Sequence, residues 1–370
     1  MIRVFEPKLN RNDYISIFKT LYKNNISGSS PTIQEFEKKL ANRFDAKYGV
    51  ALSNGSVALD VALKLLDLND EDEVIIPSFT IISCLAAVIR SGAKPVFCDV
   101  NPISWNMKLE DVKKRITTKT RVVLMVHTYG LAAEAEKIKE FCSSNNIILI
   151  EDAAEAHGQI VNEKKCGSFG DMATFSFYAN KHITTGEGGA ILSNNIEYSK
   201  KVRQLINLDF NNTLRFQHNN LYWNYRMSGL QAALGISQID NLDKVITKKI
   251  KQGNYYEQLL SNSSDLVSIQ PKRFEGVENH YWVFGILLKK EGIRDNLIKN
   301  LLDEGVETRP FFWPLHLQNA LPHEYFNKGL ELKVSENLGR NGLYIPIGEH
   351  VSKSDQNKII DKLLYNIKKS

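Results

Sequence analysis

One segment of the chain does most to decide its fold: FSFYANKHITTGEGG, residues 175–189. Its start belongs to an apolar run at 174–177 that predicts a buried strand, and its glycines predict a turn into a second strand at 190–192. Lys181 lies between the two predicted strands. A lysine that is partly removed from water there loses basicity and can form an imine with a carbonyl compound. On its own, however, a lysine after a strand is more often a surface charge.

Apolar runs alternate with helical stretches on the N-terminal side of this segment. The runs predict strands at 74–76, 95–98, 121–126 and 147–150, and helices at 81–89 and 132–141. The runs are continuous, as expected for strands that are buried on both faces. We therefore predict an α/β fold whose large domain is built on a mostly parallel sheet.

Polar residues stand where three of these predicted strands end: Asp99, His127 and Asp152. Parallel sheets bind ligands beyond the carboxyl ends of their strands. The strand ends are therefore the first place to look for a site.

The pattern changes after about residue 241 into a long predicted helix at 242–260, followed by a strand at 281–288 and a helix at 295–303. We predict a large domain at 31–245 and a smaller C-terminal α+β domain at 246–370. Residues 1–30 are expected to pack on the small domain or on a partner.

The composition is that of an ordinary globular protein, with 43% apolar and 24% charged residues among 370. A net charge of +5 does not mark a nucleic-acid binder and suits a small anionic ligand equally well. The four cysteines lie far apart, without histidines at metal spacing, so neither a disulfide framework nor a metal site is predicted. No apolar run approaches the roughly 20 residues of a membrane helix, and a cytoplasmic protein is expected.

Two further motifs add to Lys181. The turn Ser53–Ser56 opens a very apolar helix, whose free N–H groups and serine hydroxyl can hold a phosphate, although an ordinary helix cap fits it as well. In the segment 151–158, Asp152 ends a buried strand and needs a cationic or donor partner, unless it only caps the next helix.

Taken together, the phosphate cradle, the buried acid and the lysine are the three anchors that pyridoxal 5′-phosphate needs. The acid pairs with the protonated pyridine nitrogen, the lysine holds the aldehyde, and the helix end holds the phosphate. The motifs GxGxxG after the first strand, GxxxxGK[ST] and HExxH do not occur.

With these motifs in view, the chain resembles the DegT/DnrJ/EryC1/StrS family of sugar aminotransferases, which implies an aspartate-aminotransferase-like fold (fold type I of the pyridoxal phosphate enzymes). The segments that carry the resemblance are Glu6-Pro7, Ser53–Ser56, His127–Gly130, Glu151–Gly158, Phe175–Gly189, Asn224–Met227 and Glu307–Phe312. They are spread over nearly the whole chain.

The resemblance implies a role for each matching cofactor residue. Lys181 matches the lysine that binds the cofactor aldehyde and then carries a proton between cofactor and substrate. Asp152 matches the acid at the pyridine nitrogen, and Glu155 the residue that hydrogen-bonds the ring hydroxyl. The phosphate ligands implied are Gly55, Ser56 and Ser176. Many members carry an aromatic residue, stacked on the cofactor, where this chain has Ile81.

Three further residues are implied to act at the edge of the site. Asn224 matches an asparagine that reaches the phosphate of the neighbouring subunit, so a homodimer with active sites at the subunit interface is expected. Arg309 matches an arginine near the nucleotide-sugar, with a salt bridge inside the small domain as the alternative. His127 is a candidate for substrate binding, with a structural hydrogen bond to a loop as the alternative.

Within the family, the chain is most similar to members that use glutamate to aminate C4 of GDP-4-keto-6-deoxymannose, giving GDP-perosamine. Alternatives are a UDP- or dTDP-linked 4-keto-6-deoxyhexose as acceptor, or a non-catalytic regulator that keeps the fold. A related dehydratase carries histidine in the lysine position. Counting back from residues 183–189 places Lys181, and not His182, in that position, which favours transamination.

Overall fold

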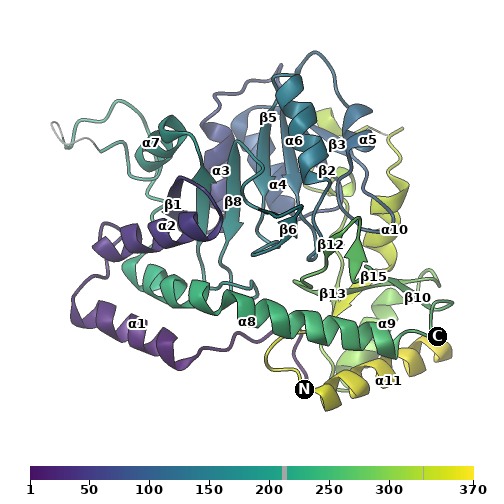
Figure 1. Cartoon of the computed structure of the whole chain (residues 1–370). Helices are drawn as coiled ribbons and strands as arrows, with labels where there is room; N and C mark the ends of the chain where they lie inside the picture. Colours follow the sequence, from purple (N-terminus) through teal and green to yellow (C-terminus); the bar gives the residue numbers. More distant parts are fainter. Residues whose placement is uncertain (211–214, 328) are drawn as a thin grey trace.

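A seven-stranded sheet forms the centre of the larger part of the computed structural model, which describes residues 1–210, 215–327 and 329–370 (Figure 1). Its strands, in spatial order, are β1 (Tyr48–Leu52), β9 (Gly189–Ser193), β8 (Met172–Ser176), β5 (Ile148–Asp152), β4 (Thr120–Val126), β2 (Glu73–Pro77) and β3 (Lys94–Cys98). From β8 to β3 every neighbouring pair is parallel, and only β9 runs against its neighbours β1 and β8. The predicted α/β class with a mostly parallel sheet is confirmed.

Helices cover both faces of this sheet, which explains why the strand sequences are apolar throughout. One face carries α3 (Gly55–Lys64), α4 (Ile82–Ser91) and α7 (Ile196–Leu205), and the other carries α2 (Pro31–Arg43), α6 (Ala135–Ser144) and part of α8 (Gly229–Leu259). In β4, Val122 and Leu124 pack on the face that carries α3 and α4, whereas Val123 and Met125 pack on the face that carries α6. Successive side chains of a strand point to opposite faces, so both sets are buried.

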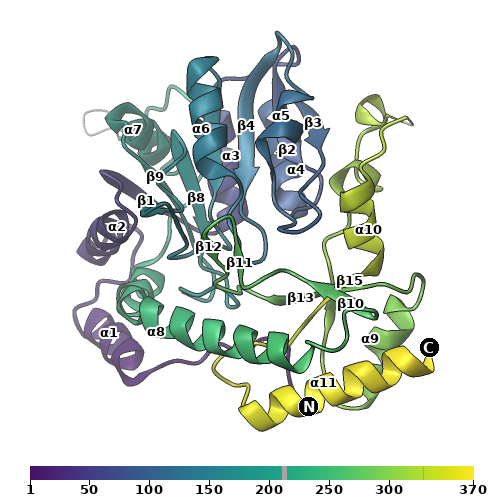
Figure 2. The ribbon, with the colours of Figure 1, turned by 45° about the vertical axis from the view of Figure 1, so that its right-hand side comes forward.

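A second, antiparallel sheet organises the C-terminal part (Figure 2). Its order is β10 (Val267–Ile269), β13 (Phe284–Leu288), β15 (Gly342–Ile345) and β14 (Arg309–Pro310). Three helices accompany it: α9 (Arg294–Asp303), α10 (Lys333–Asn341) and α11 (Lys353–Lys369). The remaining short elements are α5 (Leu109–Lys113), β6 (Ile160–Val161), β7 (Lys164–Lys165), β11 (Arg273–Phe274), β12 (Val277–Glu278) and 3-10 turns at Leu315–Leu317 and His323–Tyr325.

The long helix α8 begins at Gly229, well before the predicted start at residue 242. Two glycines near its start weaken the helical pattern in the sequence. In the structure Gly235 is needed because a Cβ there would lie 2.4 Å from the ring of Phe36, and Ser228 with Gln231 forms a capping box. Leu242 packs in the core of the first sheet and Tyr256 in that of the second. A domain boundary near residue 245 remains a prediction.

The N-terminal segment contacts both parts of the chain. Helix α1 (Arg11–Tyr22) lies along α8, where Ser16 donates a hydrogen bond of 2.6 Å to the carbonyl oxygen of Ala233. Further upstream, Ile2 forms a parallel bridge with Val306 beside the second sheet. Among the residues that the structure describes, no helix has both the length and the apolar character needed to cross a bilayer.

Candidate active site

A cavity of about 800 Å³ opens at the carboxyl ends of β5 and β8 and at the N-terminus of α3. The predicted residues that line it are Gly55, Ser56, Asp152, Glu155, Ser176 and Lys181. Trp282, Phe312 and Tyr344 close it from the side of the second sheet. Segments far apart in the sequence therefore build one site at the sheet edge where parallel sheets bind ligands.

The first part of this cavity is a cradle at the start of α3. Asn54 caps the helix, because its side-chain oxygen accepts a hydrogen bond of 2.9 Å from the N–H of Val57. Position 55 must be glycine, since a Cβ there would lie 2.6 Å from Cβ of Ser176. The hydroxyls of Ser56 and Ser83 lie 2.7 Å apart beside it. First-turn N–H groups, a helix dipole and hydroxyl donors together suit a phosphate.

The second part is the carboxylate of Asp152, which is 4% exposed at the last position of β5. One oxygen accepts hydrogen bonds from the N–H of Ala154 (3.1 Å) and the hydroxyl of Thr174 (3.3 Å). Among the residues that the structure describes, the other oxygen has only the thiol of Cys84 as a hydrogen-bond partner, at 3.7 Å. Burial raises the pKa of Asp152, and the Ala154 N–H and the charge of Lys181 oppose the rise. This weakly satisfied oxygen fits a protonated ring nitrogen, because a cation there would stabilise the buried charge.

The third part is the amine of Lys181, which lies between an acid and an aromatic ring on a side chain that is 10% exposed. Its Nζ lies 3.5 Å from Oε1 of Glu155 and 3.8 Å from the centre of the Trp282 ring. Burial lowers the pKa of Lys181, while the charges of Glu155 and Asp152 oppose the change. Burial likewise raises the pKa of Glu155 to about 7, although the N–H of Tyr129 donates to its other oxygen at 3.1 Å. An amine of reduced basicity that lines a cavity is suited to nucleophilic attack on an aldehyde and to proton transfer.

We expect Glu155→Gln, without cofactor, to melt at a higher temperature than the unsubstituted chain at pH 8. The folded-state pKa of about 7 lies above the ordinary value of 4.5, so the native carboxyl prefers its protonated form. The unfolding free energy is therefore unaffected by this carboxyl below about pH 4.5. It falls as the pH rises toward about 7, because the folded protein must then give up a proton that it holds more tightly than the unfolded chain does. Glutamine does not titrate, so the variant should gain about 1–3 kcal/mol at pH 8. Thermal melts between pH 4 and 8 check this, and a gain that does not vary with pH would contradict it.

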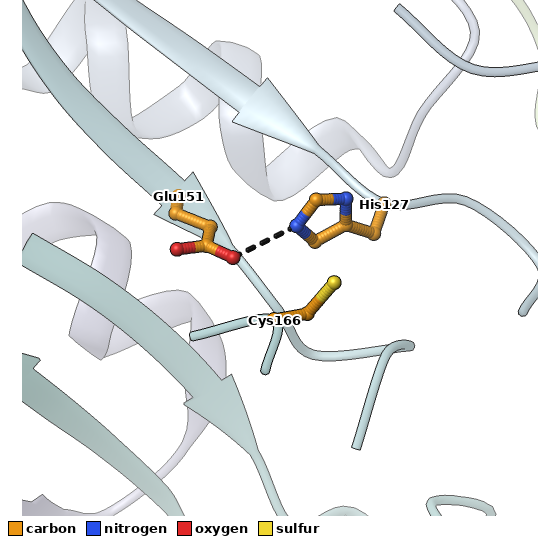
Figure 3. Close-up of side chains that lie close together, drawn as sticks. All are labelled: His127, Glu151 and Cys166. Carbon is orange, nitrogen blue, oxygen red and sulfur yellow. Dashed lines mark hydrogen bonds and ion pairs between the residues drawn. The ribbon is translucent and has the colours of Figure 1, made fainter. Parts of the chain in front are cut away.

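His127 is placed differently from the other predicted site residues. Its Nδ1 accepts a hydrogen bond of 3.0 Å from the N–H of Ala133, so Nε2 carries the proton and donates to Glu151 at 2.9 Å. Figure 3 shows this pair with the thiol of Cys166 beside it. Glu151 also accepts from the backbone N–H groups of residues 169 and 170, at 2.8 and 2.9 Å. The side chain of His127 is fully buried and both of its ring nitrogens form hydrogen bonds. His127 therefore fits the structural alternative better than a contact with substrate.

Arg309 and Asn224, which the family resemblance assigns to the site, do not line the cavity of their own chain. Arg309 lies in β14, pairs with Glu307 at 3.1 Å and faces the ring of Phe5 at 5.3 Å. It lines a separate groove of about 590 Å³ together with Arg3 and Phe5. Asn224 is exposed, and its backbone pairs with that of Asn207. Their roles toward substrate and cofactor remain predictions.

Some lining residues were not predicted as members of the site. Ser83 and Tyr178 line the cavity next to the predicted motifs, and Tyr344 reaches it from the end of β15. No local sequence signal marks Tyr344, because strand pairing across the second sheet brings it there. His182, by contrast, is buried and does not line this cavity, so the amine in the site is that of Lys181.

Comparison with known proteins agrees with this geometry. The model of the DegT/DnrJ/EryC1/StrS aminotransferase family matches residues 9–364. The chain is 35% identical to the GDP-perosamine synthase of Vibrio cholerae over 94% of both chains. It is 29% identical to the dTDP-4-dehydro-2,3,6-trideoxy-D-glucose 4-aminotransferase of Saccharopolyspora spinosa, over 98% of this chain and 96% of that one.

Its fold superposes on the crystal structure of the aminotransferase TlmJ from Streptoalloteichus hindustanus with a TM-score of 0.93, at 25% identity and over 100% and 99% of the two chains. Family match, full-length likeness and a cavity that fits the cofactor lead to one conclusion. The chain belongs to the DegT/DnrJ/EryC1/StrS family and is a pyridoxal-phosphate-dependent sugar aminotransferase.

Proposed function

We propose that the enzyme moves an amino group from glutamate to C4 of a GDP-linked 4-keto-6-deoxyhexose, with GDP-4-keto-6-deoxymannose as acceptor and GDP-perosamine as product. The observation that carries this proposal is the 35% identity to a GDP-perosamine synthase over 94% of both chains. The intact set of Lys181, Asp152 and Glu155 supports catalysis over a purely regulatory role.

Each residue of the site has a separate role in this reaction. Bound in the cavity, pyridoxal phosphate supplies an aldehyde carbon that bonds to amines and a cationic ring that accepts electrons. Asp152 holds the positive charge at the ring nitrogen, and Ser56 and Ser176 bind the phosphate. Nζ of Lys181 removes the proton from the donor carbon and returns one at C4 of the acceptor, and its lowered pKa makes it competent for both.

An acceptor with a diphosphate also fits the surroundings of the site. The groove that contains Arg3 and Arg309 adjoins the cavity, because Arg309 pairs with Tyr344 across β14 and β15, and Phe5 packs edge-on against Tyr178. Arginine side chains recognise phosphate oxygens well. The groove offers space for a nucleotide beside the sugar.

A substrate panel tests the nucleotide. With glutamate as donor, kcat/KM for GDP-4-keto-6-deoxymannose is expected to exceed that for the UDP- and dTDP-linked ketosugars by at least about tenfold, because a site built to hydrogen-bond one base leaves polar groups unpaired with another. The measurement is product formation by mass spectrometry. A preference for the dTDP-sugar would favour the second candidate function, which the likeness to a dTDP-sugar 4-aminotransferase supports more weakly at 29% identity.

We further propose a homodimer in which Asn224 acts in the partner's site. Tyr225 lines the cavity of its own chain, whereas the exposed Asn224 does not. Helix α1 exposes large apolar side chains that a second copy can cover, with Tyr14 62%, Phe18 68% and Tyr22 81% exposed.

Subunit mixing is expected to restore activity to two defective variants. Asn224→Asp would place a negative charge at the phosphate of the partner, and Lys181→Ala removes the amine, so each homodimer should be nearly inactive. In a hybrid dimer, one site carries both defects and the other carries none. An equal mixture after subunit exchange should therefore regain about a quarter of the normal activity. No recovery, despite hybrid dimers in native mass spectrometry, would contradict a role of Asn224 in the partner's site.

A further inference from the structure

The indole of Trp282 lies against the amine of Lys181. The distance from Nζ to the ring centre is 3.8 Å, well inside the range of a cation–π contact. Trp282 is 5% exposed, so little water competes for the amine. A desolvated contact of this kind is stronger than one at the surface.

Three contacts hold the indole in this place. Its Nε1–H donates a hydrogen bond of 3.0 Å to the carbonyl oxygen of Asn180, the residue before the lysine. The backbone carbonyl oxygen of Trp282 accepts a hydrogen bond of 2.7 Å from the buried Nζ of Lys249. Its ring also packs against Tyr129, with the centroids 5.9 Å apart.

The loop that carries Trp282 is itself tightly constrained. Tyr281 adopts the left-handed backbone conformation, with φ of 48°, which is uncommon for a bulky side chain. Gly130 approaches this loop so closely that a Cβ would lie 2.5 Å from the backbone nitrogen of Tyr281. Gly253 leaves room for the Tyr281 ring, since a Cβ there would lie 2.3 Å from it. So much local constraint is typical of a segment that places a functional side chain.

We propose that the face of the Trp282 indole is the docking place of the Lys181 amine whenever this amine is not bonded to the cofactor. Trp282 is then a positioning residue. It keeps Nζ beside Glu155 and inside the cavity during the part of the cycle in which the amine carries a proton to and from the substrate carbon. The inference rests on the proposed role of Lys181.

Four charged or titratable groups around Lys181 act on its amine in addition to the indole. Glu155 and Asp152 attract the ammonium form, whereas Lys249 repels it and His157 interacts with its charge. None of these groups changes when Trp282 is replaced by leucine, which is also apolar but lacks the ring.

The first test uses the protein without cofactor. Competitive acetylation of Lys181 as a function of pH, read by peptide mass spectrometry, measures the pKa of its amine. Trp282→Leu is expected to lower this pKa by about 0.5 to 1 unit, because the ammonium loses the ring face. Trp282→Phe, with a weaker ring, should give a smaller shift of the same sign. The matched control is Trp313→Leu, since this indole is 41% exposed, binds the carbonyl of Leu317 and does not line the cavity.

An unchanged or higher pKa of Lys181 in Trp282→Leu, at an unaltered melting temperature, would overturn the proposal. Should the leucine variant not fold, the phenylalanine variant decides, and an unchanged pKa in it overturns the proposal as well.

The second test follows a single turnover of the holoenzyme with glutamate. Trp282→Leu should slow it by about 5- to 30-fold and increase the isotope effect of deuterium at the α-carbon, because proton transfer is the affected step. A slower reaction with an unchanged isotope effect would count against positioning. No nucleotide-sugar enters this experiment, so its outcome is independent of the proposed acceptor. A Lys181→Ala enzyme that still transaminates would instead refute the role of Lys181 itself.

Discussion

Replacing Lys181 by alanine is expected to reduce transamination by about 10³-fold or more, because the substitution removes both the covalent anchor of the cofactor and the group that transfers the proton. The amine lies 3.5 Å from Glu155 and shares the cavity with Asp152, and the lysine side chain is only 10% exposed. Alanine leaves no basic group in its place. The rate with glutamate and a nucleotide-linked ketosugar measures the loss. Borohydride treatment should attach the cofactor to the peptide that contains residue 181 in the unsubstituted enzyme but not in Lys181→Ala.

Lys139→Ala is the matched control for this substitution. Lys139 pairs with Asp171 at 2.7 Å and does not line the cavity. Its loss should leave both activity and borohydride labelling unchanged. A Lys181→Ala enzyme that is still labelled by borohydride at another lysine would place the anchor elsewhere and contradict the site described above.

Asp152→Asn is expected to slow the half-reaction with glutamate by about 10²- to 10⁴-fold, because removing one partner of a buried ion pair costs several kcal/mol. Asparagine matches aspartate in size but carries no charge to stabilise a cationic ring nitrogen. The hydrogen bonds of Asp152 to Ala154 and Thr174 show that the side chain is already held in position, so the change affects charge more than geometry. Stopped-flow absorbance of the bound cofactor measures the effect.

Asp99→Asn provides the comparison for Asp152. Asp99 also follows a strand of the parallel sheet, but its carboxylate accepts hydrogen bonds from the backbone and hydroxyl of Ser335 at the start of α10. This variant should lose stability while the half-reaction stays near its normal rate. Equal losses of rate in the two variants would mean that the charge of Asp152 has no special role.

Six of the seven strands of the first sheet were predicted because their signals are local, whereas β1 (Tyr48–Leu52) was not predicted. Strands that are buried on both faces are apolar at every position, so the runs at 121–126 and 147–150 mark β4 and β5 to within a residue or two. Helix α8 was predicted too short because its first turns contain Gly229 and Gly235. Only the packing of Gly235 against Phe36 explains why a glycine is favourable there.

Candidate site residues could be located from the sequence where one short segment contains both the functional group and the strand end, turn or helix start that positions it. Lys181 with its glycine-rich turn, Asp152 at the end of a strand and Gly55 at the start of a helix are such cases, and the structure brings them to one cavity. The phosphate cradle also required proximity to Ser176, which the sequence motif around Gly55 does not contain.

By itself, the sequence determined the α/β class, most strands of the first sheet and three candidate anchors for the cofactor, because periodicity and strand ends are properties of neighbouring residues. Only the tertiary structure decided which polar strand ends face the cavity. Asp152 does, while Asp99 binds α10 and His127 binds Glu151. It also decided that Trp282 lies on the amine of Lys181. Such contacts join residues distant in the chain, and their geometry depends on how two sheets pack, which no local pattern encodes.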